Sequence, residues 1–139
     1  MQPNLIGFLC QSGAYTFYES GHPLLRSVAR EFQAFPVVHV LQVQITDAMK
    51  AFRLGAAGVL LAGCETCWNN REAVTQQHTE LLHKLAERGI VSERCRLEWC
   101  SAQEAEKFFA AVAALRACVR ELPPLRLPIT LDETIVHCG

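Results

Sequence analysis

The first half of the chain contains two apolar runs, each followed by a segment with helical spacing. Residues 4–10 read as a buried strand that ends in a Gln-Ser-Gly turn, and residues 37–43, rich in β-branched side chains, read as a second strand. Apolar residues at helical spacing predict a helix over 22–34 between them. Thr46, in a capping position, predicts that a second helix begins there and runs to residue 52, before Gly55.

The second half repeats this pattern. Residues 58–64 form an apolar run without alternation, which is typical of a central strand covered on both faces. An apolar stripe predicts a helix over 71–88. Residues 95–99 alternate between apolar and charged side chains, as an edge strand does, and Ser101 and Glu104 form a capping box ahead of a last helix.

The order βαβαβαβα predicts an α/β fold with an open, mainly parallel, flavodoxin-like four-stranded sheet. We expect residues 1–120 to form one domain, because half of the 139 residues are apolar and the chain has the usual length of a domain. The proline-rich segment after residue 121 cannot continue a helix, so residues 121–139 are expected to be a C-terminal tail. A short strand over 129–136 is predicted within this tail, which would pack on the domain or on a partner.

Charge and hydropathy exclude several kinds of partner. The net charge is -1 and no cluster of Lys and Arg is present, which argues against binding to nucleic acid or anionic lipid. No apolar run is long enough to span a membrane, and residues 1–4 lack the start of a signal peptide. We therefore expect a cytoplasmic protein that does not insert into a membrane. No nucleotide- or flavin-binding motif is present either.

Seven cysteines are many for a cytoplasmic chain of this length, and an odd number argues against a fully paired disulfide framework. Residues that follow parallel strands gather at one edge of the sheet, where ligands usually bind. The cysteines expected at this edge are Cys10, Cys64, Cys67 and Cys100. In a strand order of 2-1-3-4, the first two would flank the crevice between neighbouring strands. Cys95 and Cys118 are expected to be structural.

Cys64 and Cys67 form a C-x-x-C motif at a strand end. Two thiolates from one short loop can reach the same metal ion, and the motif also suits a thioredoxin-like dithiol or plain burial. Zinc is an alternative to iron, because four thiolates satisfy its tetrahedral site equally well. Trp68 and Trp99 are expected beside this edge, where they could shield a centre from water.

Several segments resemble the delta subunit of methyl-viologen-reducing hydrogenases. The similarity includes IGFLC at residues 6–10, KAFRLGAAGVLLAGC at 50–64, and the pattern from Leu81 through Leu97-Glu98-Trp99 to Phe108. It covers roughly residues 5–112 and leaves out the tail. The resemblance implies a small, non-catalytic subunit that uses a 2Fe-2S cluster to pass electrons from a hydrogenase, or another donor, to the flavin subunit of a heterodisulfide-reductase-like complex.

The chain departs from the cysteine pattern of that family. Gly13 stands where the second cysteine of the first C-x-x-C would be, and no cysteine follows the second predicted strand. We therefore expect a rearranged site in which Cys100 supplies the missing ligand, with Cys138 as a second candidate. Two alternatives remain: a metal-free docking or assembly subunit of such a redox complex, and a dithiol or sulfur-handling protein that uses Cys64 and Cys67.

Overall fold

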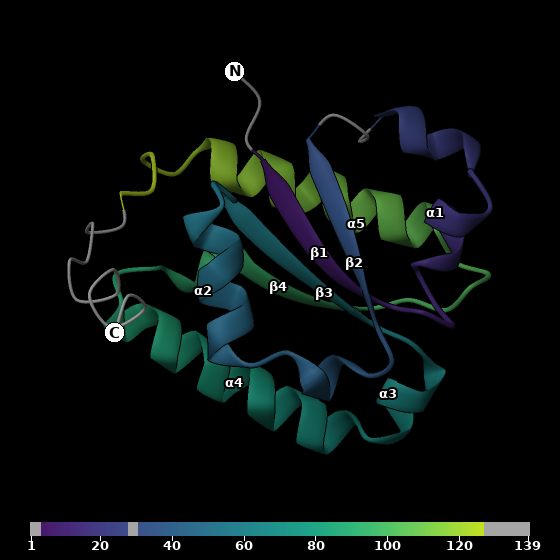
Figure 1. Cartoon of the computed structure of the whole chain (residues 1–139), viewed down its shortest axis with the longest axis horizontal. Helices are drawn as coiled ribbons and strands as arrows, with labels where there is room; N and C mark the ends of the chain where they lie inside the picture. Colours follow the sequence, from purple (N-terminus) through teal and green to yellow (C-terminus); the bar gives the residue numbers. More distant parts are fainter. Residues whose placement is uncertain (1–3, 28–30, 127–139) are drawn as a thin grey trace, which may run out of the picture.

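Four strands form one parallel sheet in the order β2-β1-β3-β4 (Figure 1). The computed structural model describes residues 4–27 and 31–126. The strands are β1 (Leu5–Cys10), β2 (Phe32–Val37), β3 (Gly58–Gly63) and β4 (Cys95–Trp99). This arrangement confirms the predicted α/β fold with an open, flavodoxin-like sheet.

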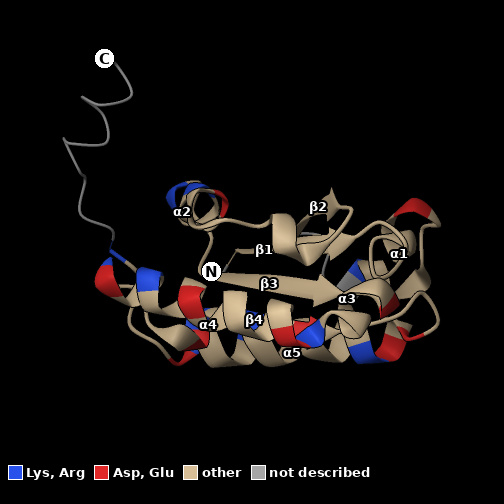
Figure 2. Cartoon of the chain, turned by 90° about the horizontal axis from the view of Figure 1, so that it is seen from below, with Lys and Arg blue, Asp and Glu red and all other residues tan. Residues whose placement is uncertain are grey.

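Helices cover both faces of the sheet. The α-helices are α1 (Thr16–Glu19), α2 (Ile45–Arg53), α3 (Glu65–Asn69), α4 (Arg71–Glu87) and α5 (Ala105–Arg120). The 3-10 helices are η1 (Pro23–Ser27), η2 (Val40–Gln42) and η3 (Ser92–Arg94). Charged residues lie mainly on the helices, whereas β3 in the middle of the sheet carries none (Figure 2). None of the helices in the described part of the chain combines the length and apolarity needed to cross a membrane.

The alternation of side chains along the strands divides the interior into two cores. The first core lies under α2 and α4 and takes Ile6 of β1 and Val59 of β3. The second core lies under α1 and α5 and takes Leu5 and Leu60, the neighbouring positions. Every residue of β3 is buried, because both of its faces are covered, as its unbroken apolar run predicts.

The prediction for the segment between β1 and α2 was wrong. Residues 22–34 do not form one helix: Pro23–Ser27 is a short 3-10 helix, and β2 already begins at Phe32. Phe32 pairs with Leu5 and is buried in the second core, which fixes the register of the strand. Pro36 is tolerated within this strand because β2 is at the edge of the sheet and needs no partner on its outer side.

The predicted second strand over 37–43 therefore lies too late in the sequence. Val40–Gln42 forms a 3-10 helix instead of a strand. The Gln42 side chain stabilises this turn, since its Oε1 accepts hydrogen bonds from the N–H groups of Val38, at 2.7 Å, and His39, at 3.1 Å.

Two helix starts also differ from the prediction. Thr46 is not the cap of α2, which begins at Ile45. The Asp47 carboxylate accepts a hydrogen bond from the Gln44 N–H at 2.8 Å, as carboxylates in the first turn of a helix often do. α5 begins at Ala105 with Glu104 as its N-cap, so Ser101 is not the cap that the sequence predicts, although its N–H donates to Glu104 Oε1 at 3.0 Å.

The remaining predicted elements agree with the structure. These are β1, β3, α4 and the edge strand β4. The beginning of the tail packs on the domain, with Leu122 against the second core and Leu125 against the first. Residues 127–139, including the strand predicted over 129–136 and Cys138, lie outside the described residues.

Candidate metal centre

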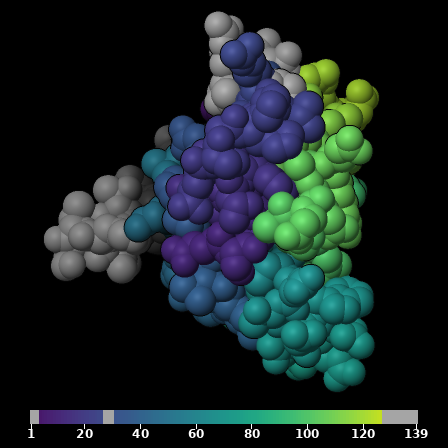
Figure 3. All heavy atoms as spheres, turned by 90° about the vertical axis from the view of Figure 1, so that its right-hand side faces the viewer, coloured from purple at the N-terminus to yellow at the C-terminus, as the bar shows by residue number. Residues whose placement is uncertain are grey.

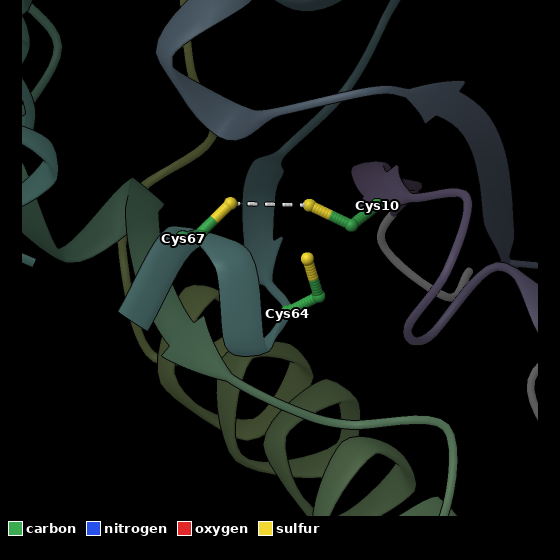
Figure 4. Close-up of side chains that lie close together, drawn as sticks. All are labelled: Cys10, Cys64 and Cys67. Carbon is green, nitrogen blue, oxygen red and sulfur yellow. Dashed lines mark hydrogen bonds between the residues drawn. The ribbon is translucent and has the colours of Figure 1, made fainter. Parts of the chain in front are cut away.

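Three thiols lie together where β1 and β3 end (Figure 4). Cys10 is the last residue of β1, Cys64 directly follows β3, and Cys67 is in α3. Their Sγ atoms all lie within 4.8 Å of one another, and the Sγ atoms of Cys10 and Cys67 are 3.4 Å apart. All three residues are buried.

The fold explains why these cysteines converge. β1 and β3 are hydrogen-bonded parallel neighbours, with Leu9 opposite Ala62, so their carboxyl ends lie side by side. Cys64 is the N-cap of α3, and its carbonyl accepts a hydrogen bond from the Trp68 N–H at 2.9 Å. One helical turn then brings Cys67 back over the strand ends, because residues three apart share a helix face.

On the side of the molecule to which the strands point, three parts of the chain meet (Figure 3). The segment after β1 is flanked by the region of α3 and the start of α4 and by the beginning of α5. Gly13 lies in the segment after β1. A Cβ on this residue would lie only 2.8 Å from the Cys100 carbonyl oxygen and 3.0 Å from Cys64 Cβ, so no side chain fits there without a shift of its neighbours.

Gly63 allows Cys67 to approach the end of β3. A Cβ on Gly63 would lie 3.0 Å from Cys67 Cβ and 3.0 Å from Cζ3 of Trp99. We expect Gly63→Ala to lower the free energy of unfolding by about 1–3 kcal/mol, as overpacking does, and to lower the metal retained per folded chain because Cys67 must move. Chemical denaturation and metal analysis of the purified variant would measure the two effects.

Gly58→Ala is the matched control for Gly63→Ala. Gly58 is at the other end of β3, and its added Cβ would contact the side chains of Leu115 and Val119 at 3.1–3.2 Å. This variant should lose stability and keep its metal. Equal metal retention by the two variants would show that Gly63 does not position Cys67.

The environments of the three thiols differ. Burial, together with the neighbouring Cys67 thiol, raises the pKa of Cys10 strongly. Burial also acts to raise the pKa of Cys64, but hydrogen bonds from the Ser12 side chain and from the backbone at Cys67 and Thr66 outweigh it, and the pKa falls from 9.0 to about 7. Ser12 was not identified as a candidate site residue from the sequence. Its position in the turn that follows Cys10 is the feature that could have identified it.

These environments predict which thiol reacts first in the metal-free, reduced protein. Alkylation by iodoacetamide at Cys64 should accelerate as pH rises, with a midpoint of about 7, because the thiolate is the nucleophile and the protonated thiol is not. Cys10, Cys95 and Cys100 should react slowly, since burial raises the pKa of each. Mass spectrometry of peptides quenched over a pH series would measure the rates, and Cys64→Ser should remove this phase.

The three thiols suit one thiophilic metal ion. Ligands about 2.3 Å from a tetrahedral ion lie about 3.8 Å from each other, so small side-chain movements would bring all three Sγ atoms into range. A 2Fe-2S cluster takes four protein ligands, and in the described residues no fourth Cys, His, Asp or Glu joins the group. The group therefore fits the anchoring of a metal or cluster, but it supplies three of the four ligands.

The fourth predicted ligand, Cys100, lies apart from this group. Its side chain belongs to the second core, and its thiol donates to the carbonyl oxygen of Glu104 at 3.3 Å. Cys95 is buried at the opposite end of β4, and the Cys118 thiol donates to the Glu93 carbonyl oxygen at 3.9 Å. Neither Cys95 nor Cys118 joins the three thiols.

An aromatic pair lies beside the centre. The rings of Trp68, which follows Cys67, and Trp99 pack edge to face with centroids 5.2 Å apart. The Arg71 guanidinium lies 4.8 Å from the Trp68 ring centroid. The Trp99 ring and Cys67 both lie close to Gly63, so the two tryptophans cover one side of the end of β3. Trp68 itself is 47% exposed.

Comparisons with known proteins show which sequences this chain is similar to. The sequence model of the family described as "Methyl-viologen-reducing hydrogenase, delta subunit" matches residues 5–123. An iron-sulfur subunit of the F420-non-reducing hydrogenase of Archaeoglobus profundus is 29% identical over 129 residues, which covers 90% of this chain and 94% of the relative. An iron-sulfur subunit of the F420-non-reducing hydrogenase vhc of Methanococcus voltae is 29% identical over 136 residues, covering 91% and 90% respectively.

Proposed function

Because the chain belongs to the delta-subunit family of methyl-viologen-reducing hydrogenases, we propose that it is an electron-transfer subunit of a hydrogenase-associated redox complex in the cytoplasm. In this proposal it carries a 2Fe-2S cluster. It takes electrons from a hydrogenase or another donor module and passes them to a heterodisulfide-reductase-like flavin subunit. It has no catalytic residues of its own.

One observation carries the proposal: Cys10, Cys64 and Cys67 meet at the end of the sheet. Iron-sulfur clusters are held by cysteine thiolates and supply one-electron redox chemistry when bound. The three thiols would anchor the cluster, and the hydrogen bonds that reach Cys64 favour its thiolate form, which is the form that ligates metal. Cys100 as the fourth ligand remains a prediction from the sequence.

The test is the iron and acid-labile sulfide content of the full chain purified without oxygen, with EPR spectra of the reduced state. About two irons and two sulfides per chain and a reducible centre would support the proposal. Zinc in place of iron would indicate a structural metal site and contradict the electron-transfer function. A folded protein that binds neither metal would leave a docking or assembly subunit as the better account.

The lowered pKa of Cys64 favours a second candidate, a dithiol protein. In this function the Cys64 thiolate would attack a substrate disulfide, and the Cys67 thiol would resolve the mixed disulfide. The substrate would leave as two thiols, while Cys64 and Cys67 became a disulfide. Metal-free protein that reduces a small disulfide, with the activity lost in Cys64→Ser, would support this function against the electron-transfer proposal.

A further inference from the structure

We infer that Cys10, Cys64 and Cys67 form a three-thiolate metal centre whose fourth coordination position takes a thiolate from outside this chain, and that Cys100 is a core residue. This inference rests on the proposed function for the presence of a metal at the site. The inferred ligand set differs from the one that the sequence predicts. It leaves one coordination position of the metal at which an external ligand can exchange.

The alternation of side chains along the strands separates Cys100 from the other thiols. Cys10 shares a strand face with Ile6, and Cys64 and Cys67 belong to the same first core. On β4, this face carries Cys95, Leu97 and Trp99. Cys100 follows Trp99 directly, so its side chain turns to the opposite face, where it lies in the second core.

Cys100 is also held in place on that face. It is 2% exposed, and its thiol contacts the carbonyl oxygens of Glu104 at 3.3 Å and Ser101 at 3.5 Å. The backbone of Gly13 packs closely against both the Cys100 carbonyl oxygen and Cys64 Cβ. To reach the metal, the Cys100 side chain would have to leave the second core and lose its contacts with the Glu104 and Ser101 carbonyl oxygens.

No other side chain in the described part of the chain completes the set. Among residues 4–27 and 31–126, the three cysteines form the only group of potential ligands. All three cysteines are buried, and Cys64 is the most exposed of them at 5%, so a ligand from outside the chain would approach on the Cys64 side. Thiolates select metals such as zinc and the iron of iron-sulfur clusters, and these metals accept a further thiolate, which points to a thiolate of a small molecule or of another protein.

Cobalt(II) added to the full chain without oxygen tests the ligand count independently of iron and sulfide. One cobalt per chain is expected, with sulfur-to-cobalt charge-transfer absorption. Because each thiolate contributes to this absorption, Cys10→Ser, Cys64→Ser and Cys67→Ser should each reduce it by about a third in a three-thiolate site. Cys100→Ser and Cys100→Ala should leave it unchanged, as should the control Cys95→Ser. A loss with both Cys100 variants equal to that with the other three would overturn the inference.

The open position is tested on the gel-filtered 1:1 cobalt complex. 2-Mercaptoethanol should add charge-transfer absorption and shift the ligand-field bands. A spectrum that does not respond would show a closed site and overturn the inference. If the cobalt spectrum responds to 2-mercaptoethanol only in the Cys138→Ser variant, the chain's own tail supplies the fourth thiolate. That result would also overturn the inference. A responsive cobalt site in protein that never assembles an iron-sulfur cluster would uphold the inference and reject the proposed function.

Discussion

Cys67→Ser is expected to reduce the iron bound by anaerobically purified protein to background. The Sγ of Cys67 lies 3.4 Å from that of Cys10 and within 4.8 Å of that of Cys64, so its removal leaves two thiols at the site. A serine hydroxyl is a poor ligand for iron at neutral pH because its alkoxide forms far less readily than a thiolate. Iron and sulfide analysis of the purified variant would measure the loss.

Cys95→Ser is the matched control. Cys95 is as deeply buried as the site cysteines, with 3% exposure, but it lies at the beginning of β4, at the opposite end of the sheet. Both substitutions place a hydroxyl in an apolar interior, which lowers the free energy of unfolding by about 1–3 kcal/mol when the hydroxyl finds no partner. Only Cys67→Ser should lose iron. Equal iron in the two variants would show that Cys67 is not a ligand.

Phe108→Ala is expected to have the largest effect on stability, lowering the free energy of unfolding by about 3–5 kcal/mol. Phe108 is fully buried at the centre of the second core. Its ring centroid lies 4.9 Å from that of Phe109, 5.8 Å from that of Phe17 and 5.9 Å from that of Phe32. The substitution would leave a cavity between α5, α1 and β2. Chemical denaturation followed by circular dichroism would measure the change.

Phe108→Leu separates the cavity from the loss of an aromatic ring. Leucine keeps most of the buried apolar volume, so this variant should lose clearly less stability than Phe108→Ala. Metal content per folded chain should stay at the wild-type level in both variants, because Phe108 and the three thiols lie in different cores. If either variant folded fully but bound less metal than the wild type, the packing of the second core would affect the thiol site on the other face of the sheet.

The sequence determined most of the second half of the fold. The unbroken apolar run of β3, the stripe of α4 and the alternation of β4 each predicted an element that the structure contains. Between β1 and α2 the local signals were misleading. Leu24, Leu25 and Phe32 have helical spacing, but Phe32 instead pairs with Leu5 in the sheet, a contact between residues distant in the sequence.

For the site, the sequence by itself determined that strand ends carry cysteines and that Cys64 and Cys67 can reach one point. The strand order then put Cys10 beside them, as the parallel βαβ pattern predicted. Only the tertiary structure decided on which side of the sheet each thiol lies. Successive side chains point to opposite faces, so Trp99 packs against the first core whereas the thiol of Cys100, the next residue, lies in the second. The packing of β4 against the helices decides which of its faces turns to each core. This packing joins residues that are far apart in the sequence, so no short segment predicts it.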